Sequence, residues 1–471
     1  MKSFLSNVKF VLTMALVATL VGSCGDFKKT SVVTPPSTGS LDFSRFVSIG
    51  NSLTAGYQSG ALYASAQKWS FPADIARQAG LPDSSFEQPL FTDPGVGGRL
   101  EIVSLSGTSP TITAASANST LQPTDVGLLR PFNNLGVPGA IAYDLIDTSD
   151  FATKAFLRQN PFFYSILRSS AFGKSVVAQA LALKPTFVSV WIGANDVLGY
   201  ATSGGTTGSD PATHTLPTDV ATFTGVYDQI MNALLTGAPN AKFVVANIPD
   251  VAAIPFFTTL PPFVLGPNGS PIVVSGHHVP LYVQRHDASG KLYVGLADTL
   301  HDYILLTAID EISSLYGTKA NLPISDSLVL DAYEAGNVEV AIAGYNSAIA
   351  QVAASNPTRI ALVDAYTIFN NFAKYGYVGQ GISLDNSFIT GGFFGLDGVH
   401  PTSQGYAYVA NIFIDAINSK FGSNIPILPI ASAPSSIIFA PQAGATRMGL
   451  PRISRSDLQY TLKLIQGGSM R

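Results

Sequence analysis

The segment Phe46–Thr54 reads FVSIGNSLT and joins an apolar run to a corner of the chain. Its first four residues have the composition of a buried β-strand, and a helix can begin just after it, at Ala55. The corner places the hydroxyl of Ser52 at the edge of a sheet and its N–H near the positive end of a helix. Ser52 is therefore a candidate nucleophile.

Two observations keep a plainer interpretation of Ser52 open. The strand-corner signature G-x-S-x-G is absent from the chain. A serine in front of a helix is also most often an N-cap, whose side chain accepts a hydrogen bond from a backbone N–H. Whether Ser52 is a nucleophile or a helix N-cap therefore depends on the other residues that could act with it.

The first candidate partners lie far downstream, in the D-x-x-H motif of Asp397 and His400. This spacing on a loop brings a carboxylate beside an imidazole. The carboxylate can then fix the imidazole tautomer, and the imidazole can take the proton of a serine. The alternative is an ordinary surface turn before the helix expected at Thr402.

Two further blocks suit the stabilisation of an oxyanion. Asn195 lies in the sequence GAND, directly after the apolar run 187–192, and an amide donor at the end of a strand suits an oxyanion hole. The segment Asn134–Gly139 reads NLGVPG, and its glycines allow a backbone N–H to approach a substrate oxygen. Both blocks could instead be simple turns.

Taken in order, the four blocks resemble those of the SGNH hydrolases, also called GDSL esterases or lipases, over roughly residues 43–421. The resemblance implies Ser52 as nucleophile, His400 as base and Asp397 behind it. It also implies an oxyanion hole made by the N–H groups of Ser52 and Gly139 and the amide of Asn195. The family usually has Asp before the nucleophile, where this chain has Asn51.

Strand-like and helical segments alternate along the chain, which indicates an α/β fold with a parallel sheet and helices on both faces. The resemblance implies a three-layer α/β/α sandwich around about five strands, of flavodoxin-like type. We expect strands over 43–49, 186–192, 242–248 and 359–363, with a short one before Asn134. We expect helices over 171–183, 218–235, 297–316, 339–354 and 402–421.

The expected hydrolase domain covers residues 43–425 and contains two insertions. Residues 85–130 are rich in Ser, Thr, Gly and Pro and predict loops with short strands, and 253–296 contains turn signals typical of hairpins. Residues 426–471 form a C-terminal tail that either wraps the domain or is partly loose.

The N-terminus indicates export. Residues 10–21 form an apolar run of signal-peptide length, too short to span a bilayer. The residues before Cys24, the only cysteine, resemble the lipobox of bacterial lipoproteins, which implies a signal peptide over 1–23 and a lipid on Cys24. The alternative is a lone cysteine after a simple signal peptide. Residues 24–42 read as a tether, and the expected location is the bacterial cell envelope, on the outer membrane.

The composition, with 46% hydrophobic and 12% charged residues, suits an exported protein with a large core. A net charge of −4 gives no basis for nucleic-acid binding. His277, His278 and His286, with Asp287, raise the question of a metal site, but they lack a ligand signature and we expect solvent-exposed side chains. No metal or cofactor is expected.

One group of phenylalanines follows an expected strand, and another precedes Asp397. Both groups should lie on the loop side of the sheet, where they could either form the wall of an acyl pocket or belong to the core. They are Phe256, Phe257 and Phe263, and Phe393 and Phe394. The sequence thus predicts a serine ester hydrolase. A polysaccharide O-deacetylase of the same family and a non-catalytic surface protein that binds glycans or lipids are the alternatives.

Overall fold

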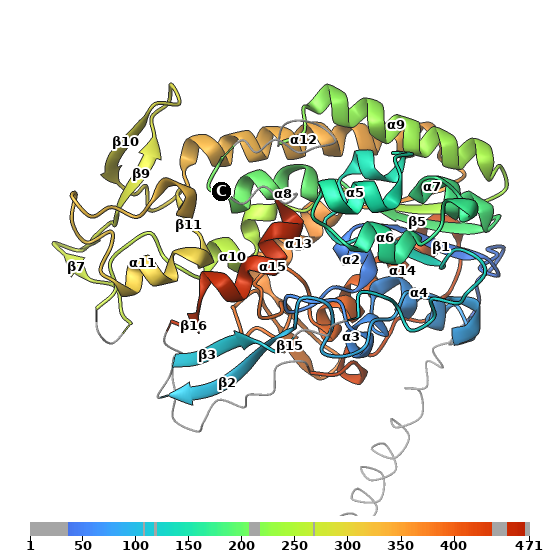
Figure 1. Ribbon diagram of the computed structural model, residues 1–471, viewed down its shortest axis with the longest axis horizontal. Helices are drawn as coiled ribbons and strands as arrows, with labels where there is room; N and C mark the ends of the chain where they lie inside the picture. The colour runs from blue at the N-terminus through green and yellow to red at the C-terminus, as the bar shows by residue number, and fades with distance from the viewer. Residues whose placement is uncertain are drawn as a thin grey trace, which may run out of the picture. The chain divides into compact units, whose positions relative to one another are not determined.

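A five-stranded parallel sheet lies between two layers of helices (Figure 1). The computed structural model describes residues 36–106, 109–116, 120–206, 217–266, 269–435 and 450–466. Ser37–Arg471 forms one compact unit, separate from Met1–Pro36. The expected signal peptide and Cys24 lie outside the described residues. In spatial order the strands are β13 (Ile360–Val363), β6 (Lys242–Ala246), β5 (Phe187–Trp191), β1 (Phe46–Gly50) and β4 (Asn134–Gly136).

The strands form the sheet because both of their faces are apolar. Alternate residues of a strand point to opposite faces. On β1, Val47 and Ile49 belong to one buried cluster and Phe46 to another. Strand β5 divides in the same way, with Val188 and Val190 on one side and Phe187 on the other, so each face carries its own core.

Helices cover both faces, which confirms the predicted three-layer α/β fold. One core contains side chains of α7 (Val176–Ala182), α9 (Val220–Gly237) and α12 (Ala332–Ser355). The other contains side chains of α4 (Phe71–Gln78), α13 (Ala365–Tyr375) and α14 (Ser403–Phe421). The remaining helices are α2 (Ser52–Ala55), α3 (Ala64–Gln67), α5 (Phe151–Leu157), α6 (Phe162–Leu167), α8 (Asn195–Thr202), α10 (Pro255–Thr258), α11 (Ile309–Ser313) and α15 (Arg455–Ile465).

The strand order decides where a site can form. β1 pairs with β4 on one side and with β5 on the other, so the order reverses beside β1. In open α/β sheets, ligands bind at such a switch point, outside the carboxyl ends of the strands. Ser52 follows β1 and Asn195 follows β5, and both therefore lie at this edge.

The helix predicted over 297–316 is wrong over most of its length. The structure has a turn, the short strand β11 (Tyr303–Ile304), a 3₁₀ turn and only then α11. The side chain of Asp302 accepts a hydrogen bond from the N–H of Asp298, at 2.8 Å, and Asp298 accepts one from Leu300. Such side-chain bonds compete with helix formation. In addition, β11 pairs with β12 (Val329–Leu330).

Two other predicted helices differ in length from the observed ones. α12 begins earlier than predicted, at Ala332, because Asp331 and Glu334 form a capping box at its start. α7 begins later, at Val176, where Ser175 accepts a hydrogen bond from Ala178. The helices predicted over 218–235 and 402–421 are confirmed as α9 and α14.

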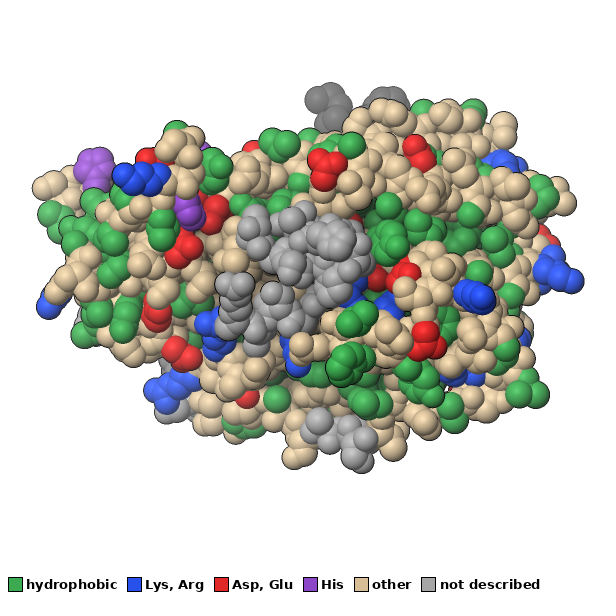
Figure 2. Space-filling view, turned by 45° about the horizontal axis from the view of Figure 1, so that its top comes forward, with side chains coloured by type: hydrophobic (Ala, Val, Ile, Leu, Met, Phe, Trp, Pro, Cys, Tyr) green, Lys and Arg blue, Asp and Glu red, His purple; other side chains and the backbone are tan. Residues whose placement is uncertain are grey.

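The two insertions contain the short strands and hairpins that the sequence predicts. β2 (Leu100–Ser106) pairs with β3 (Ser109–Ala114) in the first. The second holds the hairpins β7 (Val273–Val274) with β8 (His277–His278), and β9 (Tyr282–His286) with β10 (Leu292–Leu296). In Figure 2 the histidine side chains lie at the left end, over these hairpins. A further hairpin is β14 (Tyr377–Gly379) with β15 (Ile382–Leu384).

Part of the C-terminal segment folds against the rest of the chain. β16 (Arg452–Ile453) pairs with β3, and α15 follows with Ser454 and Asp457 as its capping box. Leu458, Leu462, Leu464 and Ile465 of this helix are buried in the larger core. The domain limits drawn from the sequence stay predictions. Among the described residues, no helix is long and apolar enough to cross a membrane.

Candidate active site

Ser52 is the first residue of α2, directly after the corner that follows β1. The N-cap of this helix is Asn51, whose side chain accepts the N–H of Leu53 at 3.0 Å. The alternative interpretation of Ser52 as a helix cap is therefore wrong. As a first-turn residue, Ser52 keeps an N–H that has no partner within the helix.

The structure brings Ser52, His400 and Asp397 together in one hydrogen-bonded chain. Nε2 of His400 lies 2.8 Å from Oγ of Ser52, and Nδ1 of His400 lies 2.9 Å from Oδ2 of Asp397. All three residues are buried, with exposed fractions of 6%, 3% and 0%. This arrangement can move the serine proton to the imidazole, because the carboxylate holds the other ring nitrogen as a donor.

Asp397 is held in its charged form by its surroundings. Burial by itself raises the pKa of this carboxyl, but attraction to His400 and its hydrogen bonds outweigh burial and hold the pKa below its usual value. The N–H groups of Val399 and His400 bind Oδ1, and the N–H of Gly60 binds Oδ2 at 2.9 Å. The carboxylate is therefore fixed from two separate loops.

Gly139, in the loop after β4, and Asn195, the first residue of α8, lie at the same edge of the sheet. Nδ2 of Asn195 donates to the carbonyl oxygen of Ala140 at 2.9 Å, which ties the asparagine amide to the residue after Gly139. An amide nitrogen carries two hydrogens, so the second remains for a ligand. Gly139 has a φ of +77°, a conformation that favours glycine.

The comparison with protein families agrees with this geometry. The family model described as GDSL-like Lipase/Acylhydrolase matches residues 46–413. The chain belongs to the GDSL-like lipase/acylhydrolase family. It is accordingly a member of a family of ester hydrolases, and the resemblance seen in the sequence is confirmed at the level of the family. No curated protein matches the chain.

Two solved structures are similar to this GDSL-like family member at low identity. A protein of Parabacteroides merdae described as a GDSL-like lipase is 12% identical, with 80% of this chain and 97% of that chain covered and a TM-score of 0.31. An extracellular lipase from Streptomyces rimosus is 14% identical, with 80% and 98% covered and a TM-score of 0.31.

A buried polar network, which the sequence did not reveal, positions the Gly139 loop of this GDSL-like protein. Nη1 of Arg158 lies 2.9 Å from both carboxylate oxygens of Asp144, which also accepts the N–H of Ile141. Nδ2 of Asn160 donates to the carbonyl oxygen of Pro138 at 2.6 Å. The side chains of Arg158 and Asn160 bond to residues 14 and 22 positions away and carry no motif, so only the fold identifies them.

Two more residues that sequence reasoning missed act on the same region. Asp196, next to Asn195, accepts the N–H of Ala142 and the hydroxyl of Thr218, each at 2.9 Å, and so joins α8 to the Gly139 loop. Tyr57 is fully buried, and its ring centroid lies 4.7 Å from that of His400. Its ring therefore restricts the orientation of the imidazole.

The phenylalanines that could wall a pocket or belong to the core do not all lie together. Phe263 is half-buried, and its ring centroid lies 4.4 Å from that of His278. Phe256 and Phe257 are 1% exposed and belong to the larger core, so the core interpretation holds for them. Phe393 and Phe394 are buried in the other core, and they also line a small cavity of about 70 Å³. The same cavity is lined by Leu53, Val399 and Pro401, which are sequence neighbours of Ser52 and His400.

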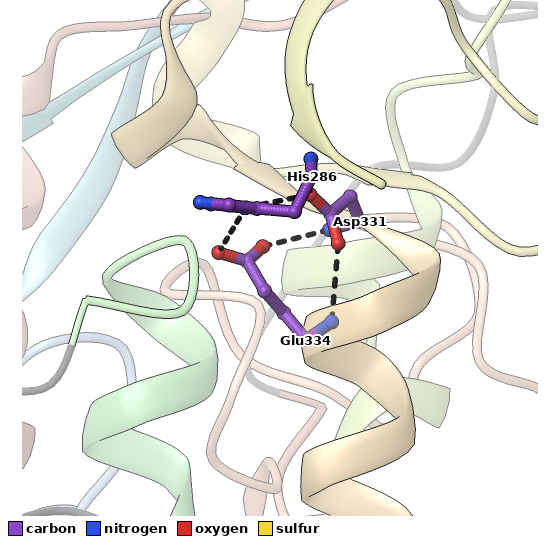
Figure 3. A group of neighbouring side chains, drawn as sticks. All are labelled: His286, Asp331 and Glu334. Atoms are coloured by element: carbon purple, nitrogen blue, oxygen red, sulfur yellow. Dashed lines mark hydrogen bonds and ion pairs between the residues drawn. The ribbon is translucent and has the colours of Figure 1, made fainter. Parts of the chain in front are cut away.

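One group among the described residues has the composition of a metal site. Ligand atoms of His286, Asp331 and Glu334 lie within 4.8 Å of one another (Figure 3). The prediction of a solvent-exposed His286 is wrong, since its side chain is 19% exposed and Nδ1 lies 3.0 Å from Oδ2 of Asp331. His277 and His278 are exposed, as predicted.

The oxygens of this group already bind backbone N–H groups. Oδ1 of Asp331 accepts from Tyr333 and Glu334, and its Oδ2 accepts from the N–H of His286. Oε2 of Glu334 accepts from the N–H of Asp331. The group therefore fixes strand β9 to the first turn of α12, and we assign it this structural role.

Replacing Asn160 by Ala tests the support of the Gly139 loop. Loss of the bond to Pro138 should let the loop move, and small displacements near reacting atoms are costly, so kcat should fall by about 10- to 100-fold. KM should change by less than about threefold, because the loss concerns the transition state. Steady-state kinetics on a nitrophenyl ester measures both. Ser165→Ala is the control, since its hydroxyl makes partly buried hydrogen bonds to the carbonyl oxygens of Pro161 and Leu121 and none to the Gly139 loop. Equal effects of the two variants would contradict the assignment.

The buried carboxyl of Glu334 predicts a pH-dependent stability. Burial raises the pKa of Glu334 to about 9 from an ordinary value of 4.5. The folded chain therefore keeps a proton that the unfolded chain releases, and stability falls as the pH rises from about 4.5 towards 9, by at most about 1.4 kcal/mol per pH unit. Glu334→Gln removes this loss. The free energy of unfolding of the variant, relative to that of the wild type, should therefore increase between pH 5 and pH 8. Urea titrations measure the difference, with the exposed Glu339→Gln as control. A difference that stays constant with pH would refute the assigned cause.

Proposed function

We propose that this chain is a serine ester hydrolase that acts on carboxylic esters through an acyl-enzyme on Ser52. The observation that carries the proposal is the hydrogen-bonded chain from Oγ of Ser52, through both ring nitrogens of His400, to Asp397. Membership of the GDSL-like lipase/acylhydrolase family supports the same class of reaction.

In the first half of the proposed reaction, Oγ of Ser52 attacks the carbonyl carbon of the ester while its proton moves to Nε2 of His400. The carbonyl oxygen becomes negative. The N–H groups of Ser52 and Gly139 and the free amide hydrogen of Asn195 donate hydrogen bonds to it. Charged Asp397 stabilises the imidazolium that forms, and its buried position makes that attraction stronger than it would be in water.

The tetrahedral intermediate then releases the alcohol. The C–O bond to the leaving group breaks, the alcohol oxygen takes the proton from Nε2 of His400, and the acyl group stays on Ser52. In the second half, a water molecule gives a proton to the same nitrogen and attacks the acyl carbon. The carboxylic acid leaves and Ser52 regains its proton, so every step uses side chains of this chain.

We also propose that the enzyme is exported and held at the cell envelope by a lipid on Cys24. The support comes from the sequence alone: an apolar run over 10–21, small residues before the cysteine, and a polar, Pro- and Ser-containing segment before the folded unit. The substrate would then be a lipid ester or an acylated glycan outside the cytoplasm.

The nucleophile is tested by Ser52→Ala. Without the hydroxyl no acyl-enzyme can form, so kcat should fall by several orders of magnitude and leave only the roughly 10³- to 10⁴-fold acceleration that binding and the oxyanion hole provide. His400→Ala should behave similarly. Hydrolysis of nitrophenyl esters and the far-UV circular dichroism of each variant should be measured together. A folded Ser52→Ala enzyme with most of its activity would disprove the mechanism.

The anchor is tested by Cys24→Ala. A cysteine that carries several acyl chains holds a protein firmly on a membrane, since each buried CH₂ contributes about 0.8 kcal/mol. The variant should therefore move to the soluble fraction or stay unprocessed. Mass spectrometry of the membrane fraction should find residues 1–23 absent and a lipid on Cys24. An unmodified Cys24 in membrane-extracted protein would count against the anchor.

A further inference from the structure

Helix α15 lies against the loops that carry the candidate catalytic residues. A Cβ atom on Gly139 would lie 2.6 Å from the carbonyl oxygen of Leu464, so the last turn of the helix rests on the oxyanion loop. Oγ1 of Thr461 lies 3.4 Å from the hydroxyl of Tyr57, the residue whose ring faces His400. The helix therefore contacts both the Gly139 loop and the residue that packs on His400.

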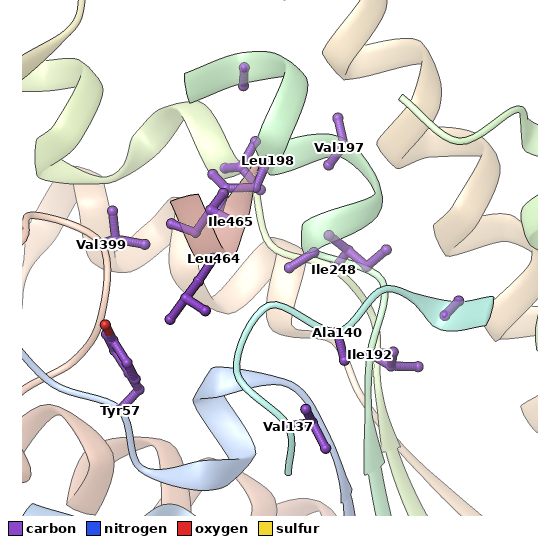
Figure 4. Close-up of a cluster of buried hydrophobic side chains, with 14 of the residues drawn as sticks. Tyr57, Val137, Ala140, Ile192, Val197, Leu198, Ile248, Val399, Leu464 and Ile465 are labelled. Carbon is purple, nitrogen blue, oxygen red and sulfur yellow. The ribbon is translucent and has the colours of Figure 1, made fainter. Parts of the chain in front are cut away.

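The last two residues of α15 fill an apolar space in front of the site. Figure 4 shows the side chain of Leu464 directed towards the space between Tyr57 and Ala140, and Ile465 beside Leu198. Leu464 is 4% exposed and Ile465 is 3% exposed. These two side chains therefore occupy a buried site, and solvent does not separate them from it.

The neighbours of Leu464 and Ile465 are next to the candidate catalytic residues in sequence. Val399, which Figure 4 places in the same cluster, precedes His400. Ala140 follows Gly139, and its carbonyl oxygen binds Asn195. Because each of these loops carries one part of the site, a chain attached to the carbonyl carbon at Ser52 can lie among the same apolar side chains.

We propose that the space filled by Leu464 and Ile465 is the acyl-chain site of the enzyme, and that these two side chains of α15 occupy it when no substrate is bound. A long acyl chain binds only when the last turn of α15 withdraws, and it then takes over the apolar contacts of these two side chains. The inference rests on the proposed esterase function and adds to it the substrate class, esters of acyl chains longer than acetyl.

The contacts of α15 suit a helix that is anchored at one end and displaceable at the other. At its start, β16 pairs with β3 and Oδ1 of Asp457 accepts the N–H of Ala114 at 3.1 Å. Around its last turn, the described polar contacts are two long ones, from Tyr57 to Thr461 and from Gln466 to Thr202, both at 3.4 Å. Apart from bonds within the helix, such as the one from the N–H of Gln466 to the carbonyl oxygen of Leu462 at 2.8 Å, an acyl chain can therefore replace the last turn without the loss of a short hydrogen bond.

The test compares hydrolysis of nitrophenyl octanoate with that of nitrophenyl acetate. In Leu464→Ala/Ile465→Ala the two side chains are smaller and leave space for the octanoyl chain. Because each methylene that becomes buried strengthens binding, kcat/KM for the octanoate should rise by about tenfold or more. For the acetate, which does not reach the space, the change should stay within about threefold. Gln459→Ala, on the exposed face of the same helix, is the control and should change neither value.

The outcomes separate this proposal from the proposed function. An active wild type whose octanoate hydrolysis does not rise in the double variant would overturn the acyl-site assignment and leave the esterase intact. Equal gains for both esters would also overturn it, because they would mean general exposure of Ser52. No hydrolysis of any ester by any variant would overturn the esterase function and this inference with it.

A second measurement uses the unaltered chain and does not depend on a variant that folds. Ser52 is labelled with a fluorophosphonate that bears either an octyl or a methyl group, and amide hydrogen exchange is followed over Arg455–Ile465. The octyl adduct should increase exchange in the last turn of α15, and the methyl adduct should leave it unchanged. Full protection of that turn in the octyl adduct would contradict the proposal.

Discussion

The site depends on one hydrogen bond between residues 348 positions apart, from Ser52 to Nε2 of His400. It forms because β1 and α14 belong to the same sheet-and-helix unit and because the loop before α14 is held in place. Asp397 fixes that loop through the N–H groups of its own turn, and through the N–H of Gly60 it joins the loop to the segment after Ser52. The bond between Ser52, the proposed nucleophile, and His400 is therefore a consequence of tertiary packing around a buried carboxylate.

The residues proposed to hold the oxyanion are also positioned by buried polar groups. Gly139 and Asn195 are tied to each other through Ala140, and the loop between them is held by buried charged and amide groups. A buried carboxylate such as Asp144 is stable only when it is paired, and Arg158 supplies that pair. Donors held in this way need little reorganisation when charge develops on a substrate, which is the condition for strong electrostatic stabilisation.

The sequence allowed the sheet and the candidate residues to be predicted because both have local signals. Apolar runs mark the strands, and Ser52, Asn195 and His400 each stand just after a strand or just before a helix. The helix predicted over 297–316 failed because Asp298 and Asp302 bond the backbone, an effect that periodicity does not register. The contribution of Tyr57, Arg158 and Asn160 to the site could not be predicted, because the fold determines which residues they contact. The amphipathic pattern of α15 likewise does not tell which surface it covers.

If an ester transfers its acyl group to Ser52, the acyl-enzyme can be trapped and identified. The purified enzyme is mixed with a nitrophenyl ester, quenched in acid within the first turnovers, digested and analysed by mass spectrometry. We expect an added acyl mass on the peptide that contains Ser52, and its loss when the enzyme is left to turn over before the quench. An acyl group on another residue, or hydrolysis in which Ser52 is never modified, would contradict the proposed mechanism.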